Sequence, residues 1–149
     1  MEIFSGIDEF VRITAGITKW DRTAQAIQAA QSHPEGVMHS IGDSLTYVRT
    51  RRRHDTDLFT GHRRYVEVIA ADSSSVQIEV AQKRTLTPRD DYSDLTDREH
   101  FEGSGEQIRL EPGQVLVTAI DEALRYPAPA DAPCTVVHVT VEGATFHNK

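Results

Sequence analysis

Hydrophobic and polar side chains follow a helical period in the first 36 residues. A first helix of about two turns is expected after Ser5, whose side chain is placed to cap it. A second helix is expected over residues 19–31 and ends before Pro34 and Gly36. The apolar positions at helical spacing are Ile7, Phe10 and Val11 in the first segment and Trp20, Ala24 and Ile27 in the second. Residues 1–36 are therefore predicted to form a helical N-terminal part.

From His39 onward the pattern changes to that of β-strands. Runs of β-branched and aromatic residues alternate with polar ones and are separated by turn residues. Strands are expected over residues 44–49, 59–71, 76–81, 107–110, 114–120 and 134–141. No helix intervenes between them, which predicts an antiparallel sandwich or barrel. The 149 residues are expected to form one α+β, mainly β domain, in which residues 39–149 are the β-barrel body.

The connections between these strands differ in length. Residues 72–75 are polar and predict the turn of a hairpin, and Pro112 with Gly113 predicts a second tight turn. Residues 88–105 are rich in Asp, Glu and Ser and predict a long surface loop, with at most a helical turn around residues 94–100. Loops of that length in a compact domain tend to be functional or to face a partner.

The strand predicted over residues 59–71 carries a cluster of titratable side chains. Side chains two residues apart share a face of a strand, so His62 and Arg64 should point one way and Glu67 the other. Gly61, at the entry of this strand, indicates a close backbone approach or a bulge. A bulge there would reassign the faces.

Composition and charge exclude several classes of protein. The hydrophobic fraction is 38% and no apolar run approaches the roughly 18 residues of a membrane span, so no membrane association is expected. The net charge of −7 disfavours nucleic-acid binding. The N-terminus lacks the pattern of a secretory signal, and the single cysteine, Cys134, cannot form an internal disulfide. These features predict a cytoplasmic protein in which Cys134 is a packing residue.

No catalytic or metal-binding motif in the sequence identifies a reaction. The sequence contains no His-x-His, His-Glu-x-x-His, Cys-x-x-Cys or Gly-x-Ser-x-Gly motif. His62 is interpreted as a hydrogen-bonded polar residue beside Arg64, and His138, within a valine-rich strand, as a residue on the outer or polar face. With 23 acidic residues, pairs such as Glu67 with Glu122 do not by themselves indicate glycoside hydrolysis. Spacing alone therefore predicts no bound metal.

Four stretches carry a family resemblance when they are taken together. They are HSIGDSLTY at 39–47, LFTGHRRYVEV at 58–68, DLTDREHFEGSGE at 94–106 and FHNK at 146–149. In this order and over essentially the whole length, they resemble the small (beta) subunit of evolved beta-galactosidase, within the YhcH/YjgK/YiaL family. The resemblance implies a cupin-like, antiparallel double-sheet β-barrel with helices at its N-terminal side.

The resemblance also implies a metal-site pattern that this sequence keeps only in part. His62 occupies the position of the family histidine, and Glu67 and Glu122 occupy acidic positions. Thr60, Ile69 and Leu124 stand where an acid, a polar ligand and a second histidine are expected. The site is thus predicted to be degenerate, with His62 as its only retained histidine and with no metal and no cofactor. A sugar pocket is expected around His62, Arg64, Glu67 and Glu122.

The function implied is that of an accessory subunit. The chain would dock on a large catalytic beta-galactosidase subunit and be required for its full activity, without a catalytic residue of its own. Sheet edges left uncovered by the missing partner would favour a homodimer of the isolated chain. The alternative is a stand-alone sugar epimerase, mutarotase or isomerase in which His62 with Glu67 or Glu122 acts as acid and base.

Overall fold

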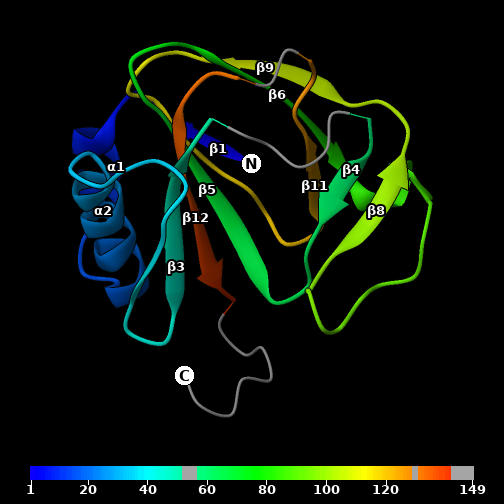
Figure 1. Ribbon diagram of the computed structural model, residues 1–149, viewed down its shortest axis with the longest axis horizontal. Helices are drawn as coiled ribbons and strands as arrows, with labels where there is room; N and C mark the ends of the chain where they lie inside the picture. The colour runs from blue at the N-terminus through cyan, green and yellow to red at the C-terminus, as the bar shows by residue number, and fades with distance from the viewer. Residues whose placement is uncertain (52–56, 129–130, 142–149) are drawn as a thin grey trace.

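The computed structural model describes residues 1–51, 57–128 and 131–141, in which two helices follow a short first strand, β1 (Glu2–Phe4) (Figure 1). Helix α1 spans Ile7–Thr14 and α2 spans Thr18–Ala30, close to the predicted ranges. The predicted side-chain cap at Ser5 is wrong, because Gly6 is the N-cap residue and Ser5 donates only its backbone N–H, to Glu9 Oε1 at 2.9 Å. Among the described residues, no helix is long and apolar enough to cross a membrane.

The remaining elements are mostly β-strands in two antiparallel sheets. The first sheet has the order β1-β10-β5-β12-β3-β2 and the second the order β7-β8-β4-β11-β6-β9. The strands are β1 Glu2–Phe4, β2 Met38–Ile41, β3 Leu45–Thr50, β4 Phe59–Gly61, β5 Tyr65–Ala71, β6 Val76–Gln82, β7 Thr87–Pro88, β8 Glu99–Glu102, β9 Glu106–Leu110, β10 Val115–Val117, β11 Glu122–Arg125 and β12 Cys134–Thr140, and a 3₁₀ turn, η1, covers Lys83–Thr85. The predicted mainly β, antiparallel double-sheet fold with N-terminal helices is confirmed.

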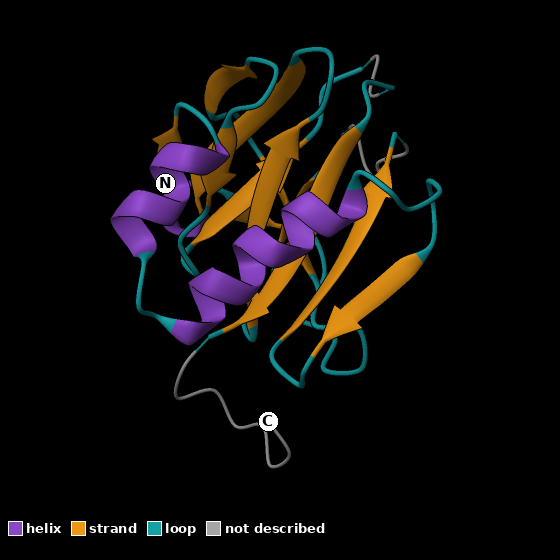
Figure 2. Ribbon diagram, turned by 90° about the vertical axis from the view of Figure 1, so that its left-hand side faces the viewer, coloured by secondary structure: helices purple, strands orange, loops and turns teal. Residues whose placement is uncertain are grey.

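Both faces of the first sheet are covered. Helix α2 lies across its outer face (Figure 2), where Phe10 and Ala26 pack with Val68, Val137 and Val139. On its inner face a second apolar cluster packs between the two sheets. Its members include Ile69, Cys134 and Val136 of the first sheet and Ile78, Val80 and Leu124 of the second. The predicted packing role of Cys134 is confirmed, since the residue is fully buried. Strands β5 and β12 therefore have no face that is simply exposed to solvent.

The strand predicted over residues 59–71 is two strands in different sheets. Strand β4 ends at Gly61 and belongs to the second sheet, whereas β5 begins at Tyr65 and belongs to the first. The close approach predicted at Gly61 involves side chains and not backbone, since a Cβ atom there would stand 2.7 Å from Lys83 Cε. Residues 62–64 cross from one sheet to the other, so the predicted alternation of faces does not continue through them.

Two predicted connections are also corrected. Residues 72–75 do not form a hairpin turn, because β5 and β6 lie in different sheets and do not pair. The predicted turn at Pro112 and Gly113 is confirmed, with Gln114 N donating to Glu111 O at 2.9 Å. The long loop predicted over residues 88–105 contains strand β8, which pairs with β4 and β7, and no helical turn.

Gly105 allows a close contact between backbones, and we expect Gly105→Ala to destabilise the fold by about 1 to 3 kcal/mol. A Cβ atom at this position would lie 2.4 Å from the carbonyl oxygen of Val80, a backbone atom that cannot rotate away. Gly6→Ala is the matched control, since its nearest atom would be 3.9 Å away and its φ of −179° is ordinary extended backbone. Urea denaturation would measure both variants. Equal stability of the two would contradict the packing described.

Candidate functional site

A cavity of about 480 Å³ lies between the two sheets. One part of its wall is apolar and comes from Met38, Val48, Leu124, Tyr126 and Val136. The other part is polar and comes from Thr60, His62, Glu67, Arg98, His100 and His138. A cavity of this size, apolar with a few converging polar groups, is the usual form of a small-molecule site.

Strand register explains how the polar and apolar parts arise. Glu67 on β5 lies directly opposite His138 on β12, so both side chains project from the inner face of the first sheet. Two residues further along β12, Val136 lies between Ile69 and Val48 and begins the apolar wall on the same face. Facing them, Thr60 lies between Leu124 and His100 in the second sheet.

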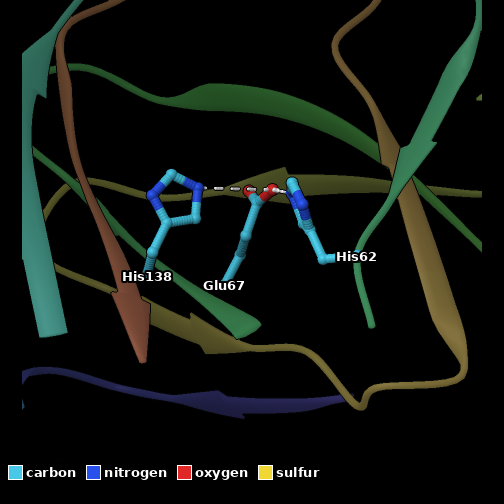
Figure 3. A group of neighbouring side chains, drawn as sticks. All are labelled: His62, Glu67 and His138. Carbon is cyan, nitrogen blue, oxygen red and sulfur yellow. Dashed lines mark hydrogen bonds and ion pairs between the residues drawn. The ribbon is translucent and has the colours of Figure 1, made fainter. Parts of the chain in front are cut away.

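His62 completes a group of three potential metal ligands (Figure 3). It lies in the segment that crosses from β4 to β5, and its Nε2 atom is 2.6 Å from Glu67 Oε1. On the other side of the same carboxylate, His138 Nε2 is 3.7 Å from Glu67 Oε1. One ligand atom from each of the three residues lies within 4.8 Å of the other two.

The hydrogen bonds of His62 restrict its protonation. Its Nδ1 atom lies 2.6 Å from the carbonyl oxygen of Asp97, which can only accept, so Nδ1 carries a proton and donates. Nε2 faces the Glu67 carboxylate, which also only accepts. Without a metal, Nε2 must be protonated too, and the pair is an imidazolium and a carboxylate. With a metal, Nε2 can present its lone pair, because the Nδ1 hydrogen bond fixes the required tautomer.

Asp97 fixes both the His62 ring and the backbone segment that carries it. The residue is 2% exposed and has a φ of 52°, in the left-handed region that Asp and Asn adopt more readily than most residues. Its Oδ1 accepts the backbone N–H of Arg63 at 2.9 Å and its Oδ2 that of Arg64 at 3.1 Å. The hydroxyl of Tyr92 also donates to this carboxylate. The Asp97 carboxylate thus fixes the segment that carries His62, while the Asp97 carbonyl orients the ring.

Both members of the His62–Glu67 pair have displaced pKa values. Burial alone would lower the pKa of His62, but the hydrogen bond and charge of Glu67, together with Asp97, raise it above its ordinary value. Burial alone would raise the pKa of Glu67, yet the imidazoles of His138 and His62 hold it far below its ordinary value. The metal-free site therefore favours the ion pair.

The stability of the metal-free protein should reflect this pair. Glu67, with its lowered pKa, stabilises the fold above its unfolded pKa, and this contribution is lost as the pH falls toward the folded value. His62, with its raised pKa, stabilises the fold below its unfolded pKa, and this contribution is lost as the pH rises through the folded value. We expect the urea midpoint in EDTA to be highest between about pH 4.5 and 6.5 and to fall above that range.

His62→Gln separates this effect from the titration of other groups. The variant keeps a hydrogen-bond donor toward Glu67 but cannot lose a proton in this range. We expect its urea midpoint to change less than that of the wild type between about pH 6 and pH 9. The same pH dependence in both proteins would show that the His62–Glu67 pair does not contribute.

The structure brings together only part of the predicted pocket. His62 and Glu67 line the cavity, whereas Arg64 and Glu122 do not. The Arg64 guanidinium contacts Asp94 and Asp97, and Glu122 accepts the backbone N–H of Ala119 at 2.7 Å and pairs with the Met1 amino group at 3.0 Å. These contacts direct both side chains away from the site.

Of the two positions predicted for His138, the outer face is wrong, because the residue lies in the polar part of the cavity wall, and His62 is not the only histidine at the site. His138 lies on the inner face of β12, and its neighbours Val137 and Val139 face the helices. Alternation with valine indicated two different faces correctly. It could not show that the valine face is covered by helices and the histidine face by the second sheet.

The donor set fits a divalent transition metal. Ligand atoms that share one such ion at about 2.0 to 2.2 Å lie about 3 Å from each other. The two distances to Glu67 Oε1, 2.6 and 3.7 Å, lie on either side of this value, and all three ligand atoms lie within 4.8 Å of one another. Two imidazoles and one carboxylate suit ions such as Zn²⁺, Fe²⁺, Mn²⁺ or Co²⁺.

Two solved structures are distantly similar to the chain. No family model matches the chain. A crystal structure of hydroquinone 1,2-dioxygenase from Sphingomonas sp. TTNP3 with 4-hydroxybenzoate bound is similar at 16% identity and a TM-score of 0.46, over 78% of this chain and 72% of that one. Hydroquinone 1,2-dioxygenase PnpCD, in complex with Cd²⁺ and 4-hydroxybenzonitrile, is similar at 14% identity and a TM-score of 0.40, over 97% and 90%. Likeness this distant carries no argument about the substrate.

Proposed function

We propose that the protein binds one divalent transition metal through His62, Glu67 and His138 and uses it to bind and polarise a small organic molecule in the cavity between the sheets. The observation that carries this proposal is the convergence of the three ligand atoms within 4.8 Å at the wall of a cavity of about 480 Å³. Three protein ligands leave coordination positions for an outside molecule, as in catalytic rather than structural metal sites.

The residues of the chain have separate roles in this function. His62 and His138 would bind as neutral imidazoles, and Glu67 would bind as a carboxylate. The Asp97 carbonyl keeps the His62 proton on Nδ1, so that Nε2 stays directed at the site. The apolar wall limits water in the cavity, which strengthens electrostatic interactions there. A bound metal of this kind would supply Lewis acidity toward an oxygen atom of the bound molecule.

This proposal replaces the acid and base roles considered for His62 and Glu67. A group that holds a metal through Nε2 or a carboxylate oxygen is not free to exchange a proton with a sugar. The region of the family resemblance is consistent with a site here, since residues 58–68 and 94–106 supply Thr60, His62, Glu67, Arg98 and His100 to the cavity.

Metal content tests the proposal directly. The chain, produced without a histidine tag and stripped with EDTA, would be dialysed against Zn²⁺, Mn²⁺ or Co²⁺ and analysed by mass spectrometry for bound metal. We expect about one equivalent in the wild type and loss of that equivalent in Glu67→Gln, which keeps the shape of the side chain. Glu102→Gln, on the exposed end of β8, is the matched control and should retain it. Equal metal content in the wild type and Glu67→Gln would refute the assignment.

Accessory action on a large beta-galactosidase subunit is a second candidate function, and the four sequence blocks of the family resemblance favour it. The fourth block, residues 146–149, lies outside the described residues. Co-expression with such a large subunit would test it, with galactoside hydrolysis measured with and without this chain. We expect co-elution and a higher turnover number in the complex. Equal turnover without co-elution would exclude this function.

A further inference from the structure

The cavity wall carries a positive charge that the protein does not neutralise. The side chain of Arg98 lines the cavity, and among the described residues its guanidinium has no hydrogen-bond or ion-pair partner. The carboxylate of Glu67, in the same wall, is already shared by His62 and His138. Arg98 is half-buried, so its guanidinium is open to a ligand in the cavity that supplies the counter-charge.

The other charged groups at the cavity also leave an excess of positive charge. His100 also lines the cavity, and its Nδ1 atom lies 2.7 Å from Asp90 Oδ2. The Asp90 carboxylate is thus bound to His100 and does not itself line the cavity. With a divalent ion bound, one carboxylate would face that ion and the Arg98 guanidinium, which leaves two positive charges in excess. The Arg98 guanidinium lacks a carboxylate partner in the cavity wall with or without the ion, so an anionic ligand suits the cavity in both states.

The apolar part of the cavity wall indicates the chemical nature of the uncharged part of the ligand. Met38, Val48 and Val136 form a continuous apolar row on the first sheet, because β2, β3 and β12 place them side by side. Leu124 of the second sheet contributes to the same wall. A sugar would place several hydroxyl groups against these side chains without hydrogen-bond partners, which costs free energy for each group. A hydrocarbon ring or branched chain would be stabilised by the same surface.

From these observations we propose that the cavity selects small organic carboxylates with an apolar body, and that Arg98 is the residue that binds the carboxylate. The planar guanidinium can donate two parallel hydrogen bonds to a carboxylate, a geometry that a neutral amide cannot match. The inference deepens and rests on the proposed function, since Arg98 lines the same cavity as the His62, Glu67 and His138 group. It names the substrate class of that site.

Isosteric probes test the selection. Cyclohexanecarboxylate, phenylacetate, their two neutral amides and D-galactose would be titrated into the zinc-loaded chain by calorimetry. We expect each acid to bind at least about tenfold more tightly than its amide, in line with charge-assisted hydrogen bonding, and galactose to bind most weakly. Equal affinity for acid and amide, or tighter binding of galactose, would overturn the proposal.

Variants assign the effect to Arg98 and separate it from metal binding. Arg98→Gln should lose the preference for acid over amide while keeping its equivalent of zinc. Arg89→Gln is the matched control, because Arg89 pairs with Glu102 at 2.8 Å and does not line this cavity. A preference that survives in Arg98→Gln would refute the role of Arg98. If the wild type takes up no metal, the proposed function fails, but the acid preference should persist in the metal-free chain and its loss in Arg98→Gln can still be measured.

Discussion

Replacing His138 by alanine should lower the affinity of the protein for Zn²⁺ by about 100-fold or more. Mutation of residues that only support a metal ligand already costs about 10- to 100-fold, and His138 would be a ligand itself. Its Nε2 atom lies 3.7 Å from Glu67 Oε1, on the side of the carboxylate opposite to His62. The affinity is measured by competition between the metal-free protein and a chelating dye.

The control for this prediction is another histidine of the same chain. His33 stacks on His39 and contacts the Tyr47 hydroxyl at 3.0 Å, outside the cavity. We expect His33→Ala to bind Zn²⁺ as the wild type does. Similar Zn²⁺ affinities for His138→Ala and the wild type would show that His138 faces the cavity without binding the metal. A lower Zn²⁺ affinity in His33→Ala would show that the metal binds at a different site.

Asp97→Ala should have the largest effect on stability, about 3 kcal/mol or more. The substitution leaves the part-buried backbone N–H groups of Arg63 and Arg64 without their acceptor, and each such loss costs about 1 to 3 kcal/mol. Alanine also tolerates the φ of 52° less well than aspartate. Urea denaturation of the metal-free proteins measures the change.

The same variant should lower Zn²⁺ affinity by about 10- to 100-fold, since the segment that carries His62 is no longer fixed. This second measurement distinguishes positioning of the ligand from a purely structural role. Asp97→Asn, which keeps one acceptor oxygen and tolerates the left-handed conformation, should lie between the wild type and Asp97→Ala. Asp94→Ala is the matched control in the same segment, since the Asp94 side chain is 92% exposed, and it should behave like the wild type. Wild-type zinc affinity in Asp97→Ala would exclude the positioning role.

The general fold could be predicted because its signals are local. Apolar residues at helical spacing predicted α1 and α2, and runs of β-branched residues predicted the longer strands β3, β5, β6, β9 and β12 together with β4 and β10. The short strands β1, β2, β7, β8 and β11 were not predicted. The site could not be predicted in the same way, because it depends on a break in the pattern. A continuous strand would place His62 and Glu67 on opposite faces, but the crossing between β4 and β5 brings Nε2 and Oε1 to 2.6 Å.

Pairing of distant strands accounts for the other missed features. His138 reaches the site only because β12 lies beside β5 with His138 opposite Glu67, and nothing near either residue encodes that register. Asp97 and Arg98 belong to a polar stretch that predicts a surface loop, yet the stretch continues into β8, which pairs with β4. The one available signal was Gly61, which marked the place where the predicted strand ends.

Anomalous diffraction from crystals grown with Co²⁺ or Zn²⁺ tests the central claim most directly. A single strong anomalous peak is expected within about 2.0 to 2.3 Å of His62 Nε2, a Glu67 carboxylate oxygen and His138 Nε2, with open positions toward the cavity. A metal-soaked crystal that shows no peak between these three side chains, with His62 still bound to Glu67, would contradict the account.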